Sequence, residues 1–213
     1  MKQLLGYATT LVLLSGLALG QNDASKKYNA LADRLRSGDQ TVNFTEFRAA
    51  AADAGIDSDP EARSKLFDAA KNRDFPKMLD AANLVLKSNY ADLDAHYFAK
   101  IAAKQVGKPE LAEFHDWVEM GLLNALRSTG DGKTPETAMK VISVHEEYFI
   151  LRMMRQQPSM QSLSTCKGNP CDIMKARDPE TGAEQTWYFD ASIPMNQMAK
   201  ALGEDKTTKK KKK

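Results

Sequence analysis

Three consecutive side chains, His145, Glu146 and Glu147, place an imidazole beside two carboxyl groups. An imidazole held next to a carboxylate is a common arrangement in general acid–base catalysis, so this triplet is the catalytic candidate of a hydrolase. A structural role is the alternative. Ser143 and Glu146 have the spacing of a capping box, and carboxylates in a first helical turn interact favourably with the helix dipole. The sequence favours this structural role and predicts a helix that begins here.

A second candidate pair, His115 and Glu119, lies one helical turn apart, so that both side chains could reach one metal ion. The chain has three histidines but no His-Glu-x-x-His motif, which leaves the signal for a metal-dependent enzyme weak. Gly132-Lys133-Thr134 imitates the end of a phosphate-binding loop, but Arg127 stands where that loop needs its first glycine. We therefore expect no metal and no cofactor.

The two cysteines, Cys166 and Cys171, are close in sequence and are separated by turn-forming residues, among them Gly168 and Pro170. An even cysteine count at short spacing favours a disulfide in an oxidising compartment. Free thiols are an alternative, and redox or metal chemistry is a further one, although the spacing is not that of a Cys-x-x-Cys motif. The sequence predicts a structural cross-link.

The first twenty residues have the pattern of a secretory signal peptide: Lys2, an apolar stretch, and small residues at Ala18 and Gly20 before a plausible cleavage site. An uncleaved membrane anchor is the alternative, but the apolar stretch is shorter than the roughly 20 residues of a spanning helix. No cysteine lies near the cut for a lipid anchor. We expect a periplasmic or secreted protein without a stable membrane anchor, beginning with a polar leader over residues 21–27.

Charge argues against nucleic-acid binding. The 30 basic residues include Lys2 and five terminal lysines, which leaves 24 against 28 acidic residues in the body of the protein. A body with a net charge of about −4 does not attract a phosphate backbone. The lysines belong to a predicted disordered tail, residues 204–213, which either is simply solvated or contacts anionic surfaces.

Most of the chain predicts helices. Apolar residues at helical spacing, aspartates before proline or leucine, and glycines at the far ends predict a helix that begins near Lys26 and further helices over 43–54, from 60, and over 75–87, 93–106 and 110–126. Turn signals at Gly38-Asp39, Arg73-Asp74 and Gly107-Lys108 recur every 34–35 residues, the period of tetratricopeptide repeats. Residues 28–127 are therefore predicted to form a tetratricopeptide-like layer of antiparallel helical hairpins.

The composition changes after this layer. Residues 128–193 contain a glycine-rich turn, the helix at His145, and two predicted strands over 173–177 and 185–189 that a turn at Asp178–Gly182 would join. An isolated hairpin is only marginally stable, so it must pack on the helices as part of the same domain. The predicted fold class is mainly α with a small β appendage.

Aromatic side chains on the predicted helices, Tyr90, Tyr97 and Trp117, are candidates for contact with a partner. Packing in the core is the usual role of such residues. Stacked helical hairpins also present a concave face, however, and aromatic residues there anchor bound peptides. The expectation of a protein or peptide partner thus rests on the analogy with other folds of stacked helical hairpins.

The block from Ser128 to Ala138, with Val141–Val144 and Glu146-Glu147-Tyr148, resembles a bacterial family known as domain of unknown function 4919. Asp172–Met174 and Tyr188–Asp190 are similar to the closing hairpin of that family, and Asp39–Arg48 to its early segment. The resemblance spans most of residues 28–191. It implies an exported protein with an α-rich fold and a small hairpin, and it implies no activity.

These observations lead to three functional hypotheses. The first is a periplasmic module that binds a protein or peptide, and it is not an enzyme. The second is a hydrolase or metal-dependent enzyme that uses the triplet at His145 or the pair at His115. The third is a periplasmic inhibitor or immunity protein, which fits a small, exported, acidic body.

Overall fold

The computed structural model describes residues 11–210 and the side chains of residues 23–203. The chain divides into two units, Met1–Ile56 and Asp57–Lys213, and each is described by itself. Residues 1–10 of the predicted signal peptide and residues 211–213 of the lysine run lie outside the described part.

The first unit consists of α1 (Leu11–Arg36) and α2 (Phe44–Asp53). The ring of Tyr28 stacks on that of Phe47 with 5.5 Å between centroids, and both side chains are buried where the two helices pack. Helix α1 begins well before Lys26, so residues 21–27 are helical and do not form a separate leader. In the described residues, every helix is too short or too polar to cross a bilayer.

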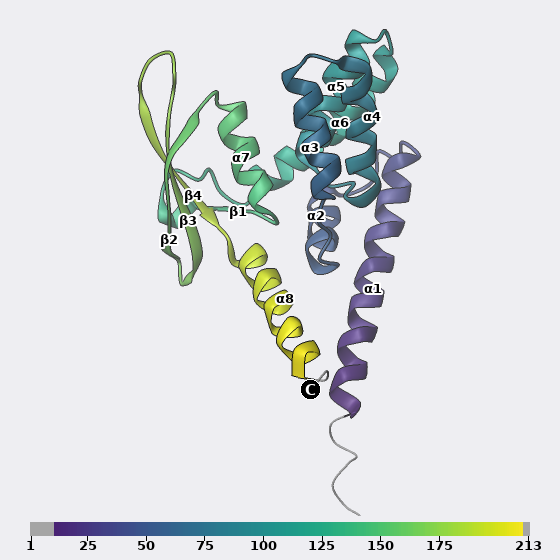
Figure 1. Ribbon diagram of the computed structural model, residues 1–213, viewed down its shortest axis with the longest axis vertical. Coiled ribbons are helices and arrows are strands. Elements are labelled where there is room, and N and C mark those ends of the chain that lie inside the picture. The colour runs from purple at the N-terminus through teal and green to yellow at the C-terminus, as the bar shows by residue number, and fades with distance from the viewer. Residues whose placement is uncertain (1–10, 211–213) are drawn as a thin grey trace, which may run out of the picture. The chain divides into compact units, whose positions relative to one another are not determined.

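The second unit begins with four helices, α3 (Pro60–Lys71), α4 (Phe75–Ser88), α5 (Leu93–Gln105) and α6 (Pro109–Arg127). Asp59, Asp74 and Asp92 cap the first three, each accepting a hydrogen bond from a backbone N–H three residues further on. Each helix packs on the next, and the short connections force neighbouring helices to run antiparallel. The predicted helical hairpins are present (Figure 1).

The three predicted turn signals share one backbone conformation. Gly38, Arg73 and Gly107 all have positive φ, at 79°, 53° and 75°, directly after a helix. The following N–H of Asp39, of Asp74 and of Lys108 reaches back to a carbonyl in the last turn, as in a Schellman motif. At position 73 an arginine adopts the positive φ that glycine adopts at the other two positions, although a side chain disfavours this conformation.

The remainder of the second unit is a sheet with two helices. It contains the 3₁₀ turn η1 (Pro135–Thr137), β1 (Met139–Lys140), α7 (Val144–Met153), β2 (Gln157–Cys166), β3 (Asn169–Arg177), β4 (Glu184–Asp190) and α8 (Ser192–Lys210). The strand order is β1-β4-β3-β2, with β1 parallel to β4 and the other pairs antiparallel. Helix α7 contacts both α5 and β2 and so joins the helical layer to the sheet (Figure 1).

The predicted hairpin is confirmed as β3 and β4, but the sheet is larger than expected. Strand β2 was not predicted, because its residues are exposed on both faces and therefore show no alternation of apolar and polar side chains. Helix α8 includes residues 204–210, where the sequence predicts a disordered tail. The mainly α fold with a β appendage is confirmed.

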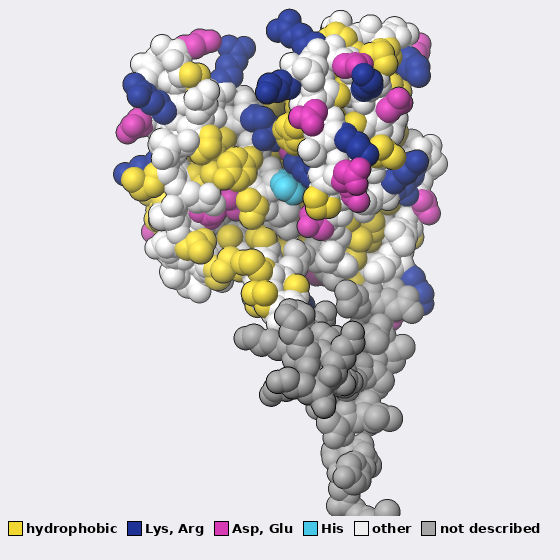
Figure 2. Space-filling model, viewed as in Figure 1, with side chains coloured by type: hydrophobic (Ala, Val, Ile, Leu, Met, Phe, Trp, Pro, Cys, Tyr) yellow, Lys and Arg dark blue, Asp and Glu magenta, His cyan; other side chains and the backbone are white. Residues whose placement is uncertain are grey.

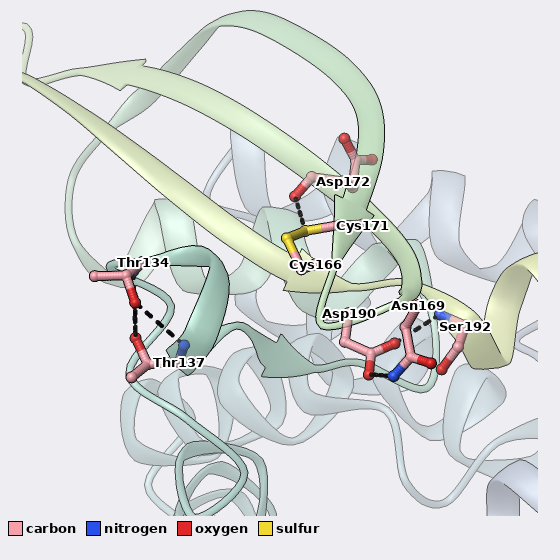
Figure 3. Close-up of a disulfide and its surroundings, with 8 residues drawn as sticks. All are labelled: Thr134, Thr137, Cys166, Asn169, Cys171, Asp172, Asp190 and Ser192. Carbon is pink, nitrogen blue, oxygen red and sulfur yellow. Dashed lines mark hydrogen bonds between the residues drawn. A yellow bond between two sulfur atoms is a disulfide. The ribbon is translucent and has the colours of Figure 1, made fainter.

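The two cysteines form a disulfide, as predicted, with 5.3 Å between the Cα atoms of Cys166 and Cys171 (Figure 3). The bond joins the end of β2 to the start of β3. Between these strands, Lys167 and Gly168 form a two-residue turn, both with positive φ, the conformation that a tight hairpin requires. The cross-link therefore secures the tip of the β2–β3 hairpin.

The glycine-rich block is a structural turn. The N–H of Gly132 donates to the carbonyl of Thr137, and the carbonyl of Gly132 accepts from the N–H of Tyr188 on β4, both at 2.8 Å. A Cβ on Gly130 would lie 2.3 Å from the carbonyl oxygen of Thr137. Asp131 accepts hydrogen bonds from the Thr137 hydroxyl and the Lys133 N–H. The block thus holds η1 and β1 against β4, and its backbone groups are used within the fold.

Candidate functional site

An open groove lies on the helical layer between α3, α4 and α5. It has a volume of about 520 Å³ and is lined by Ala70, Arg73, Phe75, Met78, Phe98, Ile101 and Gln105. Met78 is buried at the bottom, the other apolar side chains are half-buried, and the two polar side chains, Arg73 and Gln105, are exposed. An apolar floor with polar groups at its edge is typical of a binding site for a peptide or small molecule.

The helix ends place these side chains. The positive φ of Arg73 turns the chain out of α3, and the Asp74 cap starts α4 at once, so that Phe75 sits in the first turn of α4 beside the end of α3. Phe98 and Ile101 lie one turn apart on α5. The groove therefore depends on the tight α3–α4 turn that the sequence period indicated.

Aromatic contacts extend from the groove toward α7. The ring of Phe98 meets the edge of Phe67 with 5.4 Å between centroids. Two guanidinium groups lie near the Phe67 ring, that of Arg63 at 5.4 Å and that of Arg152 at 5.2 Å from its centroid. Phe67 is thus shared between the helical layer and α7, with cation–π contacts to both arginines.

The same two arginines belong to a buried charge network. Arg63 pairs with Asp92 and, at 2.6 Å, with Asp94, while Arg152 from α7 pairs with the other oxygen of Asp94. The Ser58 hydroxyl donates to Asp92 at 2.5 Å. Burial raises the pKa of Asp94, and the two guanidinium groups oppose that shift. The network ties α3, the start of α5 and α7 together.

The candidate triplet does not converge on one place. His145 is only partly covered; burial of the covered part, followed by the Arg63 charge, lowers its pKa. Glu146 is buried, and its Oε2 accepts a hydrogen bond from the N–H of Ile142 at 2.8 Å. The capping-box prediction is wrong, because Ser143 makes no side-chain cap and Glu146 bonds one residue further upstream.

Glu147 points instead toward the sheet. Its side chain is fully buried, and burial, followed by the charge of Asp172 on β3, raises its pKa to about 9. Glu147 therefore carries a proton at neutral pH. Asp172 also accepts a hydrogen bond from the Gln161 amide on β2. This carboxyl pair joins α7 to the sheet, and its burial leaves no open approach for a substrate.

The two residues predicted as metal ligands, His115 and Glu119, each contact another side chain of the protein. Nδ1 of His115 lies 3.0 Å from Nδ1 of His96, whose Nε2 is 3.0 Å from the carbonyl oxygen of Tyr90. Because a carbonyl only accepts, His96 carries its proton on Nε2 and accepts from His115 at Nδ1. Burial lowers the pKa of His115 to about 4, so the ring is neutral. Glu119 forms an ion pair with Lys100.

The three aromatic candidates lie outside the groove lining. Tyr90 is buried, with its ring 5.0 Å from that of His96. Tyr97 and Trp117 are half-buried; Tyr97 packs on Phe149 at 6.0 Å, and the Lys100 ammonium lies over its ring. Across the described side chains, no three His, Cys, Asp or Glu residues are placed to hold a metal ion together.

A family model matches residues 19–200, almost the whole of the chain, and its description is domain of unknown function, DUF4919. The chain belongs to this family. No curated protein and no solved structure is significantly similar to this DUF4919 chain. The geometry of this chain must therefore carry any statement about its function.

Sequence reasoning missed the groove of this DUF4919 protein. Phe75, Met78 and Ile101 show ordinary helical periodicity, which predicts a buried face and does not distinguish a core from an open groove. Phe98 directly follows the candidate Tyr97, but the sequence does not distinguish it from an aromatic residue of the core. The one available signal was the turn at Arg73, which shows where the hairpin closes and therefore where side chains of three helices meet.

Proposed function

We propose that this DUF4919 protein is exported and binds a segment of a partner protein in the groove of its helical layer. The observation that carries the proposal is the groove itself: half-buried Phe75, Phe98 and Ile101 form an apolar floor that remains open to solvent. Covering these apolar side chains with a partner is favourable, because it removes their surface from water.

The chemistry of the groove specifies the partner. An apolar side chain fits against Phe98 and Ile101, and the exposed Arg73 at the edge favours an acidic residue beside that anchor. The Cys166–Cys171 disulfide supports export, because such bonds persist mainly in oxidising compartments. The enzyme hypothesis loses its support, since His145, Glu146 and Glu147 have three different surroundings.

Site-specific photocrosslinking in the native host tests this proposal. A photoreactive residue at Gln105, exposed at the groove edge, should give one defined adduct with a partner. The same residue at Leu84, which is 43% exposed on α4 outside the groove, serves as the matched control and should give none. Ile101→Glu should abolish the adduct at Gln105, because a carboxylate would replace part of the apolar floor.

The results separate the hypotheses. Identical adducts at both positions, or an adduct that survives Ile101→Glu, would show that the groove is not the binding site. A single tight adduct with an enzyme would identify the partner as a target of inhibition. Fractionation of the host cells checks the exported location independently.

A further inference from the structure

Strand β2 is a long, open edge of the sheet. It has ten residues, nine of which are exposed, from Gln157 to Thr165. In the part of the chain that the structure describes, β3 is the strand that pairs with it, and its other side bears no strand. The opposite edge, β1, has only two residues. Unpaired edges attract further strands, and proteins usually protect them by shortness or charge.

Strand β2 lacks the charged side chains that commonly protect an edge strand. The segment Gln157–Cys166 contains no Asp, Glu, Lys or Arg, whereas β3 and β4 each carry charged residues. It does carry two large exposed apolar side chains, Met160 (54% exposed) and Leu163 (64% exposed). The regular run from Met160 onward places them on opposite faces of the sheet. Figure 2 shows apolar side chains exposed on the side of the molecule where Figure 1 draws the sheet and α7.

We propose that β2 pairs antiparallel with β2 of a second copy of this chain, which joins two four-stranded sheets into one continuous sheet. This inference rests on the sheet edge and is independent of the groove. The occupant is a second copy because a strand without charge offers nothing to a charged partner, whereas an identical strand matches it residue by residue about a two-fold axis.

The hairpin fixes which backbone groups are available. Cys166 and Asn169 flank the two-residue turn and form a hydrogen-bonded pair, and such pairs alternate along an antiparallel ladder. Ser164 and Ser162 therefore bond to β3, while Gln161, Leu163 and Thr165 direct their N–H and C=O groups to the open edge. Pro170 agrees with this pattern, since it lies opposite Thr165 and has no N–H to donate.

Only residues whose backbone groups face the open edge can exchange hydrogen bonds across the axis, so the axis must pass through one of them. Centred on Leu163, the pairing places Leu163 opposite itself, Gln161 opposite Thr165 and Ser162 opposite Ser164 of the second copy. Every pair is uncharged. The disulfide at Cys166 keeps one end of the strand in place, and the irregularity after Pro158 ends the flat segment at the other.

Sedimentation of the purified protein over a concentration series tests the proposal. Wild type should form a dimer, and Leu163→Lys, which places two ammonium groups on the axis, should raise the dissociation constant at least tenfold. Leu163→Pro should do the same, because it removes the N–H that faces the edge and leaves the β2–β3 bonds in place. Leu84→Lys puts the same charge on an exposed apolar site of α4 and should leave the dimer unchanged.

Cysteine crosslinking checks the register. Leu163→Cys should form a dimer that reductant dissolves, since paired Cα atoms on the axis lie about 5.5 Å apart, within the range of a disulfide. Ser162→Cys should not, because its copies lie about 7–8 Å apart on the diagonal. A wild-type monomer at all concentrations, or a dimer that survives both changes at Leu163, would overturn the proposal. Unchanged circular dichroism excludes misfolding as the cause.

Discussion

Replacing Glu147 by glutamine should make the protein more stable at neutral and mildly alkaline pH. The carboxyl group is fully buried beside Asp172 and close to Glu146, so the protein holds it protonated. Glutamine has the same shape, carries no charge at any pH and keeps an N–H that can donate to Asp172. The substitution therefore reproduces the protonated state permanently.

The magnitude follows from the pKa of Glu147, which rises from 4.5 in the unfolded chain to about 9 in the folded protein. A raised folded pKa means that its stabilising effect is complete below pH 4.5 and is lost as the pH rises toward 9. The loss is about 1.4 kcal/mol for each pH unit between these limits. At pH 7 the wild type has lost about 3 kcal/mol on this account, which Glu147→Gln avoids.

Thermal unfolding of both proteins from pH 5 to pH 8 measures the effect. The two midpoints should nearly coincide at pH 5 and separate steadily, by on the order of 10 °C at pH 8. Other titrating groups are present in both proteins and cancel in the difference. Glu146→Gln is the matched control: it weakens the hydrogen bond from Ile142 and should lower stability. A constant difference between wild type and Glu147→Gln across this range would refute the reasoning.

Three further changes test other parts of the fold, each by thermal or urea unfolding. Gly130→Ala should destabilise by roughly 3–5 kcal/mol, because its Cβ would overlap the Thr137 carbonyl, whereas Gly55→Ala, in open space with φ 65°, should lose only about 1 kcal/mol. Equal losses would contradict the packing role of Gly130. Arg73→Gly should gain about 1 kcal/mol by relieving the positive φ, and any loss of stability would show that the arginine side chain matters more. Asp94→Asn should lose about 3–5 kcal/mol, since two guanidinium groups lose their shared carboxylate; a loss below 1 kcal/mol would place the network in effective contact with water.

The helices were predictable because residues next to each helix end determine where the helix begins and ends. Asp59 followed by Pro60 starts α3, and Asp92 starts α5, each through a bond within three residues. The capping box at Ser143 is wrong by one residue: the Glu146 carboxylate accepts from the N–H of Ile142 instead of that of Ser143, and both donors lie within four residues of Glu146. The spacing of residue types alone does not distinguish between two such neighbouring donors.

The candidate sites were less predictable because they depend on residues far apart in sequence. Glu147 was considered for its neighbour His145, yet its decisive contact is Asp172 on another element. Strand β2 was not predicted because a strand exposed on both faces need not alternate apolar and polar side chains. In both cases the sequence does not show which face of a helix or strand packs against another element.

The tip of the β2–β3 hairpin is constrained twice over. The positive φ angles of Lys167 and Gly168 already fix the strand register, and the disulfide between Cys166 and Cys171 restricts the same few backbone torsions. Two constraints on one loop are redundant, so their free energies do not add. Because the closed loop is short, the cross-link contributes only about 2 kcal/mol by the chain-entropy model. Reduction should accordingly cost less than this value, and the helical layer, which contains neither cysteine, should keep its packing.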